Sequence, residues 1–336
     1  MPLDLSESLP HLVEAKYKTA KADQSLTFSP TELAIVRTSA GVPFQLRFCP
    51  SLAKKPIPQK ENHDGPTKKK RDPFDNPSAE LLIADIPSTN PSHLLVLNKF
   101  PVIAEHFILA TKTNKQQTHI LEQDDLEATY ACLEAWQAGE AHGQQRRLFA
   151  FFNSGEHSGA SQPHRHLQFL PVESMKKGEH SNEWDLLLDS MLSGENPALP
   201  FTHFASALPP NPSGSKLLET YNNLYDLARK AVDDFISTNP DEFLLHPTDK
   251  GALSISYNLA MTTSGMAICP RKSEGTMLRR DDGTEIGFVA LNGTVLGGTL
   301  MVKYQEEWDV LRSQPEKLDS ILGAIGIPKT KQTSSL

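Results

Sequence analysis

One stretch constrains the fold of this chain more than any other, residues 149–172, which read FAFFNSGEHSGASQPHRHLQFLPV. An apolar run typical of a strand ends in a loop of Gly, Ser and Asn. The loop leads to a second strand that carries His164, His166 and Gln168. Because side chains alternate faces along a strand, these three polar groups should share one face while Arg165 takes the other. The stretch therefore predicts a hairpin with a row of polar side chains.

The loop between the two strands is suited to hold an anion. Backbone N–H groups and hydroxyls can surround a phosphate in such a loop, and it offers Asn153, Ser154, Gly155, Ser158, Gly159 and Ser161. With 12 His in 336 residues, a His-x-His pair alone carries little weight. The neighbouring loop supplies the context, and we expect the polar row and the loop to form one site.

Composition excludes several classes of function. A net charge of −8 argues against an extended nucleic-acid surface, because such a surface needs many basic residues. No apolar run approaches the roughly 20 residues that span a bilayer, so we expect no membrane partner. The start of the chain lacks the basic and apolar pattern of a secretory signal. Small-molecule substrates are the expected partners, and two units in one chain make a monomer sufficient.

The three cysteines indicate a reducing compartment. Cys49, Cys132 and Cys269 are far apart and odd in number, which is typical of cytoplasmic thiols. Without a Cys-x-x-Cys pair, a structural zinc site is not expected. The basic run 68–71 is read as a solvated loop, with nuclear import or substrate gating as alternatives. The expected location is the cytoplasm, with the nucleus left open.

Hydrophobic patterns in the first half alternate between strands and helices. We expect a peripheral opening segment, with a helix at 10–21 and strands at 26–28 and 44–48. Three apolar runs between residues 72 and 112 predict an antiparallel meander, because their connections are too short for helical crossovers. A helix at 124–138 and strands at 147–152 and 164–171 complete this half.

The second half opens with a stretch rich in Gly, Ser, Asn and Pro at 173–215, which we interpret as a crossing between domains. A long helix should follow, with Ser215 as its N-cap. Strands are expected at 254–261, 266–269, 286–291 and 299–304, and helices at 305–312 and 315–322. The pattern predicts an α+β fold of antiparallel sheets packed with helices, as two related units at 1–195 and 196–336.

These residues resemble a known family. The run from His164 to Gln168, preceded by NSGEHSGAS and by LNKFPVIAEHFILATK, is similar to the nucleotidyltransferase branch of the histidine-triad superfamily, in which Gln replaces the last His. Within that branch it looks like the fungal-type diadenosine tetraphosphate phosphorylases, also called ATP adenylyltransferases. The resemblance implies a histidine-triad-like N-terminal catalytic domain and a C-terminal ATP adenylyltransferase domain.

The resemblance also implies a reaction. Diadenosine tetraphosphate is cleaved by inorganic phosphate to ATP and ADP, reversibly, through an adenylylated histidine. The nucleophile falls on His166, and the carbonyl that orients its ring falls on His164. Gln168 can donate a hydrogen bond to a phosphate but cannot protonate a leaving group, which favours transfer over hydrolysis. A divalent cation, Mg²⁺, should accompany the polyphosphate.

Further substrate-binding positions follow from the same resemblance. In the first half they are Lys55, Asn98, Lys99, Asn153, Ser154, Gly159, Ala160, Ser161 and Gln162. In the second half they are Asn292, Gly293, Thr294, Thr299 and Lys303. Lys54 competes with Lys55 for the same part, and Arg271 is interpreted as a surface residue at a strand end.

Other readings of the same motif stay open. A hexose-1-phosphate nucleotidyltransferase shares His-x-His-x-Gln, and a nucleotide-binding regulator with a silent site belongs to a different class. His164 and His166 can also bind a metal from alternate strand positions, although no third ligand stands at short spacing. A hydrolytic histidine-triad protein is disfavoured by Gln168. An intact His166 and Gln168 argue against silencing.

Overall fold

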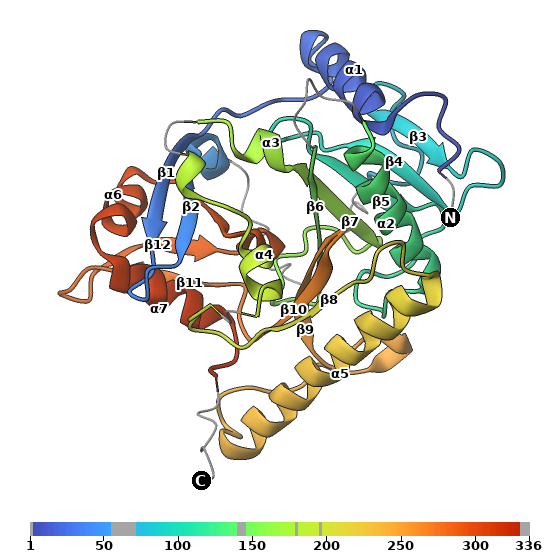
Figure 1. Cartoon of the computed structure of the whole chain (residues 1–336). Helices are drawn as coiled ribbons and strands as arrows, with labels where there is room; N and C mark the ends of the chain where they lie inside the picture. Colours follow the sequence, from blue (N-terminus) through green and yellow to red (C-terminus); the bar gives the residue numbers. More distant parts are fainter. Residues whose placement is uncertain (1–2, 55–71, 140–145, 179–180, 195–196, 330–336) are drawn as a thin grey trace, which may run out of the picture.

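The computed structural model describes residues 3–54, 72–139, 146–178, 181–194 and 197–329. At its centre lies an antiparallel eight-stranded sheet in the order β3-β4-β5-β7-β6-β9-β10-β8 (Figure 1). Its strands are β3 (Leu82–Ile86), β4 (His93–Leu97), β5 (Phe107–Thr111), β6 (Leu148–Ser154), β7 (His166–Pro171), β8 (Phe204–Ala207), β9 (Ser256–Thr262) and β10 (Gly265–Arg271).

The central sheet is shared by both halves of the chain. Strand β6 pairs with β7 on one edge, where Phe151 lies opposite Gln168, and with β9 on the other, where Asn153 lies opposite Asn258. The two predicted units therefore contribute to one continuous sheet. The predicted boundary falls at residues 195 and 196, which lie outside the described residues, and it stays a prediction.

Three helices cover one face of this sheet: α1 (Leu9–Ala22), α2 (Gln123–Gln137) and α5 (Gly214–Thr238) (Figure 1). Their apolar sides pack on rings such as Phe107 and Phe169, which are stacked at 4.8 Å. The N-cap of α5 is Ser213, two residues before the predicted cap, because the hydroxyl of Ser213 accepts the N–H of Lys216. Among the described helices, none is long and apolar enough to cross a membrane.

The opposite face carries the remaining sheets and helices. A three-stranded sheet joins β1 (Glu32–Arg37), β2 (Pro43–Phe48) and β13 (Thr299–Val302), beside the hairpin of β11 (Gly275–Arg279) and β12 (Glu285–Ala290). Strand β2 pairs in parallel with β13 and is buried, so the prediction of a peripheral opening segment is wrong. No local pattern reveals a pairing between opposite ends of a chain.

Several boundaries also differ from the pattern. Residues 26–28 are not a strand; the N–H of Thr27 bonds the carbonyl of Lys99 in an irregular segment. The predicted crossing contains α3 (Val172–Met175), α4 (Leu187–Leu192) and edge strand β8, elements too short to form without tertiary packing. Strand β13 ends at Val302 because Tyr304 begins the capping box of α6 (Gln305–Ser313), which precedes α7 (Pro315–Ile325).

Candidate active site

The polar row lies on the face of the sheet opposite α2 and α5. His166 and Gln168 stand at alternate positions of β7, and the side chain of His166 is 3% exposed. Arg165 points to the helical side, where its guanidinium lies 2.7 Å from Asp125 and 2.8 Å from Glu122 at the start of α2. The predicted division of these side chains between two faces is confirmed.

His166 is held in one tautomer. Its Nδ1 lies 2.8 Å from the backbone oxygen of His164 and must donate to it, so Nε2 carries the lone pair. Nε2 makes no hydrogen bond with the part of the chain that the structure describes. Burial lowers the pKa of His166 from 6.5 to about 4, and the bond to the His164 carbonyl opposes that shift only in part. The imidazole is therefore neutral near pH 7 and can act as a nucleophile.

The His164 ring is fixed by acceptors on both sides. Nδ1 lies 2.7 Å from Oδ2 of Asp72, and Nε2 lies 2.8 Å from the backbone oxygen of Thr111. These two contacts fix the plane of the His164 ring. Burial raises the pKa of Asp72, but hydrogen bonds from the Phe74 N–H and from His164 lower it further than burial raises it. Phe74 also packs against His166 at 5.0 Å between ring centroids. Sequence reasoning did not identify Asp72 or Phe74 as residues of the site.

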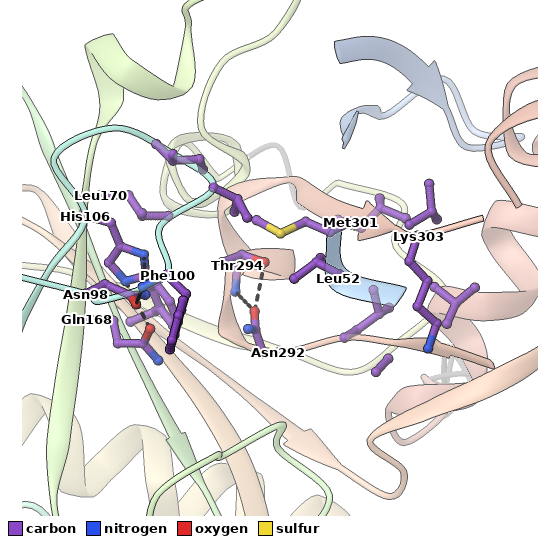
Figure 2. A pocket seen from close by; sticks show the side chains of 18 of the residues that line it. Leu52, Asn98, Phe100, His106, Gln168, Leu170, Asn292, Thr294, Met301 and Lys303 are labelled. Atoms are coloured by element: carbon purple, nitrogen blue, oxygen red, sulfur yellow. Dashed lines mark hydrogen bonds between the residues drawn. The ribbon is translucent and has the colours of Figure 1, made fainter. Parts of the chain in front are cut away.

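Gln168 is oriented by a second histidine that sequence reasoning missed. Asn98 Oδ1 accepts the Phe100 N–H at 2.9 Å, so its Nδ2 must donate to Nδ1 of His106 at 3.0 Å. The Nε2–H of His106 then donates to Oε1 of Gln168 at 3.1 Å. This chain of bonds (Figure 2) leaves the amide nitrogen of Gln168 as the donor available to a ligand.

Gln117 lies between β6 and β7 at the point where their pairing ends. Strands β6 and β7 stop pairing beyond Phe151 and Gln168. The amide of Gln117 enters there, and its Nε2 donates to the carbonyls of Asn153 at 2.8 Å and His166 at 3.2 Å. Its Oε1 accepts the His166 N–H at 2.8 Å. These bonds replace the missing β6–β7 pairing, so the backbone groups of Asn153 and His166 stay hydrogen-bonded.

The loop after β6 presents unpaired N–H groups. The backbone N–H groups of Gly159, Ala160, Ser161 and Gln162 make no hydrogen bond with the described residues. Gly159 has a φ of +79°, and a Cβ there would lie 2.8 Å from Cβ of Asn292, so only glycine allows this close approach. Ser154 instead is buried and donates to the Gln117 carbonyl. The region that can surround an anion is thus 159–162.

A buried polar network joins this loop to the second half. Asn153 Oδ1 accepts from Asn258 Nδ2 at 2.9 Å and from the Gly293 N–H at 2.8 Å. Asn258 also donates to the Ser158 carbonyl and accepts from Arg271. Arg271 is fully buried and uses its other donors on backbone carbonyls. Its interpretation as a surface residue is wrong, because strand β10 carries it into the interior.

A cavity of about 320 Å³ begins beside Gln168 (Figure 2). Gln168, His106 and Asn98 lie at one end and Lys303 at the other, with Asn292 and Thr294 between them. Much of the remaining lining is apolar, and it includes Phe100 and Phe288, which are 49% and 42% exposed. His166 does not line this cavity. It stands two residues before Gln168 on the same face, roughly 7 Å along the strand.

The remaining predicted residues lie in other places. Gly293 is buried beside Asn153, which accepts its N–H. Lys99 is exposed, with Nζ 5.8 Å from the ring centroid of Phe100. Thr299 is buried and its hydroxyl donates to Gln45 at 3.2 Å, away from the cavity lining. Lys55 and the basic run 68–71 lie outside the described residues.

Comparison with known proteins places the chain in a class. The family model described as the Ap4A phosphorylase N-terminal domain matches residues 3–186, and the model described as the ATP adenylyltransferase C-terminal domain matches residues 197–328. The fold, the His-x-His-x-Gln strand and these matches define a nucleotidyltransferase. The chain belongs to the Ap4A phosphorylase family, where Ap4A is diadenosine tetraphosphate.

Relatives from Saccharomyces cerevisiae span the whole chain. Protein APA1 is 28% identical over 351 residues, which cover 98% of this chain and 96% of that protein. Diadenosine 5′,5‴-P1,P4-tetraphosphate phosphorylase 2 is 27% identical over 344 residues, or 97% of each chain. The crystal structure of yeast Ap4A phosphorylase Apa2 has the same fold, with a TM-score of 0.76, 24% identity and coverage of 97% of this chain and 99% of that one. Apa2 has also been crystallised in complex with Ap4A.

Proposed function

We propose that this protein cleaves Ap4A with inorganic phosphate to give ATP and ADP, through an AMP group carried covalently on His166. One observation carries the proposal: the bond from Nδ1 of His166 to the His164 carbonyl leaves a neutral Nε2 without a partner in the described chain. That geometry suits a nitrogen nucleophile. Membership of the Ap4A phosphorylase family supports the choice of substrate.

The first step forms a phosphorus–nitrogen bond. Nε2 of His166 attacks the α-phosphorus, the bond from that phosphorus to the bridging oxygen breaks, and ATP leaves with the electron pair. The amide of Gln168, oriented by His106, donates a hydrogen bond to an α-phosphate oxygen but brings no acidic proton. ATP needs none, because its terminal phosphate is a stable anion. In the second step, an oxygen of inorganic phosphate attacks the same phosphorus, the bond to His166 breaks, and ADP forms.

We call the loop 159–162 the cradle. The cradle and the cavity would bind different parts of the substrate. The N–H groups of residues 159–162 point to no partner in the described chain and can bind phosphate oxygens. Lys303, at the far end of the cavity, supplies positive charge. We assign the adenosine of the transferred AMP to the 320 Å³ cavity, where Phe100 and Phe288 offer exposed rings to the base.

We also propose that the protein works as a monomer in the cytoplasm. We propose Mg²⁺ as the cation that accompanies the polyphosphate. Glu307 is the one carboxylate among the described residues that line the cavity, and its Oε1 is buried without a hydrogen-bond partner. One carboxylate fits an ion that takes its other ligands from phosphate and water. Glu307 would hold the ion, which when bound neutralises charge on the phosphates.

The test follows the phosphorus atom of the acceptor. Ap4A is incubated with ³²P-labelled inorganic phosphate, and the nucleotides are separated. We expect equal amounts of ATP and ADP, with the label in the β-phosphate of ADP and none in ATP. Hydrolysis to ATP and unlabelled AMP would contradict the proposal. Turnover with a nucleoside diphosphate hexose, and none with Ap4A, would support the hexose-1-phosphate alternative instead.

A further inference from the structure

A second group of chemically active side chains lies on the same hairpin loop but outside the proposed mechanism. Glu156 and His157 stand just before the phosphate cradle, and His246 comes from the segment between α5 and β9. One ligand atom from each of the three lies within 4.8 Å of the other two. This is the one such group of His, Cys, Asp and Glu found among the described residues.

Two of the three distances between ligand atoms match those of a small coordination shell, and the third, between His157 and His246, is at most 4.8 Å. Glu156 Oε1 lies 3.4 Å from Nε2 of His157 and 3.5 Å from Nδ1 of His246. Bonds of about 2.0–2.1 Å to a tetrahedral Zn²⁺ put neighbouring ligand atoms about 3.4 Å apart. Three converging electron-pair donors therefore surround a point that a small cation can occupy.

The two histidines are held in place by Ser256 and Phe243. Nε2 of His246 lies 2.8 Å from Oγ of Ser256, so a proton on Nε2 leaves the lone pair of Nδ1 directed at the group. The backbone N–H of His157 donates to the same hydroxyl at 3.2 Å. The ring of Phe243 packs against both imidazoles. Ser256 thus ties both ligands to the start of β9.

The group is also accessible. The side chain of Glu156 is 71% exposed, while those of His157 and His246 are 29% and 17% exposed. An ion can enter from the side of the carboxylate, and a water can complete the shell as the fourth ligand. Two nitrogen donors and one oxygen favour Zn²⁺ and its transition-metal neighbours over Mg²⁺, which prefers oxygen.

We propose that Glu156, His157 and His246 form a binding site for a single transition-metal cation of the Zn²⁺ class, separate from the Mg²⁺ that accompanies the substrate. The ion clamps the β6–β7 loop, and with it the cradle at 159–162, to the segment that leads into β9. This inference does not depend on the reaction that the protein catalyses.

The experiment uses the full chain without an affinity tag, after treatment with a chelator and gel filtration. Zn²⁺ is titrated in competition with a chromophoric chelator, with neither nucleotide nor phosphate present. The variants are Glu156→Gln, His157→Ala and His246→Ala. The matched control is His11→Ala, which removes an imidazole that is 66% exposed on α1.

We expect the unchanged protein and His11→Ala to bind one Zn²⁺ with the same affinity. Each histidine variant should bind more than about 100-fold more weakly, and Glu156→Gln at least about tenfold more weakly. Co²⁺ should give the visible absorption of a tetrahedral site in the unchanged protein and not in His157→Ala. Glu156 is exposed, so its variant folds even if a histidine variant does not.

Two results would overturn the proposal. One is that the unchanged protein binds no Zn²⁺ in the competition. The other is that Glu156→Gln and the folded histidine variants bind it as tightly as His11→Ala does, in which case the three side chains form only a surface ion-pair group. Because binding is measured without substrate, either result leaves the phosphorolysis proposal untouched.

Discussion

His166 Nδ1 donates its hydrogen bond to the backbone oxygen of His164 across 2.8 Å, so its ring is oriented by the backbone two residues earlier and not by a carboxylate. A backbone acceptor fixes the tautomer without adding charge beside an anionic substrate. The charged partner is one step removed, because Asp72 binds the ring of His164 and not that of His166. The arrangement keeps the imidazole of His166, the proposed nucleophile, neutral.

A first prediction concerns His106, which acts through Gln168. His106→Phe should lower kcat for Ap4A phosphorolysis by about 3- to 10-fold, the value of one hydrogen bond. Gln168→Ala should have at least that effect. In the Gln168→Ala background, His106→Phe should cost nothing more, because the amide that it positions is gone. The double-mutant cycle is measured by kcat and KM, with thermal unfolding as the control for folding. Additive losses would show that His106 has a separate role.

A second prediction concerns the pH dependence of the first half-reaction. Burial lowers the pKa of His166 to about 4, so the nucleophile is already neutral well below the usual pKa of histidine. Single-turnover release of ATP from Ap4A without phosphate should show no loss from nucleophile protonation near pH 6.5. Its acid limb should lie near pH 4. An acid limb centred at about pH 6.5, unchanged by varying the substrate, would mean that His166 titrates like an exposed histidine.

The same shift predicts how stability depends on pH. The unfolded chain has an ordinary histidine pKa near 6.5, so between pH 6.5 and about 4 it binds more protons than the folded chain does at His166. The free energy of unfolding should therefore fall as pH drops through this window, by up to about 1.4 kcal/mol per pH unit for this group. Urea unfolding of the protein and of His166→Asn measures the difference. Equal slopes for the two proteins would contradict the assigned shift.

A further prediction distinguishes backbone strain at Gly159 from the loss of substrate contact by residues 159–162. Gly159 and Gly283 have φ values of +79° and +86°, but a Cβ at Gly283 meets nothing within 4 Å. Alanine at either position should cost about 1–2 kcal/mol of stability through the backbone. Only Gly159→Ala should also raise KM for Ap4A, because its Cβ must displace Asn292. Matched KM values for the two variants would mean that residues 159–162 do not contact substrate.

Much of the site was predictable because it lies within one hairpin. Alternation along β7 is a local rule, and it placed His166 and Gln168 on one face and Arg165 on the other. The glycines and serines of the loop likewise predict a turn with free N–H groups. Such signals need no knowledge of distant residues.

The supporting residues were not predictable for the converse reason. His106 bonds to Gln168, which lies 62 residues away in the sequence. Gln117 bonds to His166, 49 residues away, and Asp72 bonds to His164, 92 residues away. No local pattern pairs these residues with their partners, because each partner lies far away in the sequence. The parallel pairing of β2 with β13 is missed for the same reason, since only the folded chain brings its two ends together.

The covalent mechanism is tested by locating the AMP group on the protein. The protein is incubated with Ap4A without phosphate, digested at neutral or alkaline pH to preserve an acid-labile phosphorus–nitrogen bond, and analysed by peptide mass spectrometry. We predict one AMP group on His166, absent from His166→Ala, partly retained in His164→Ala, and converted to ADP when phosphate is added. An adduct on His164, or ATP and ADP formed at the normal rate by His166→Ala, would show that His166 is not the nucleophile.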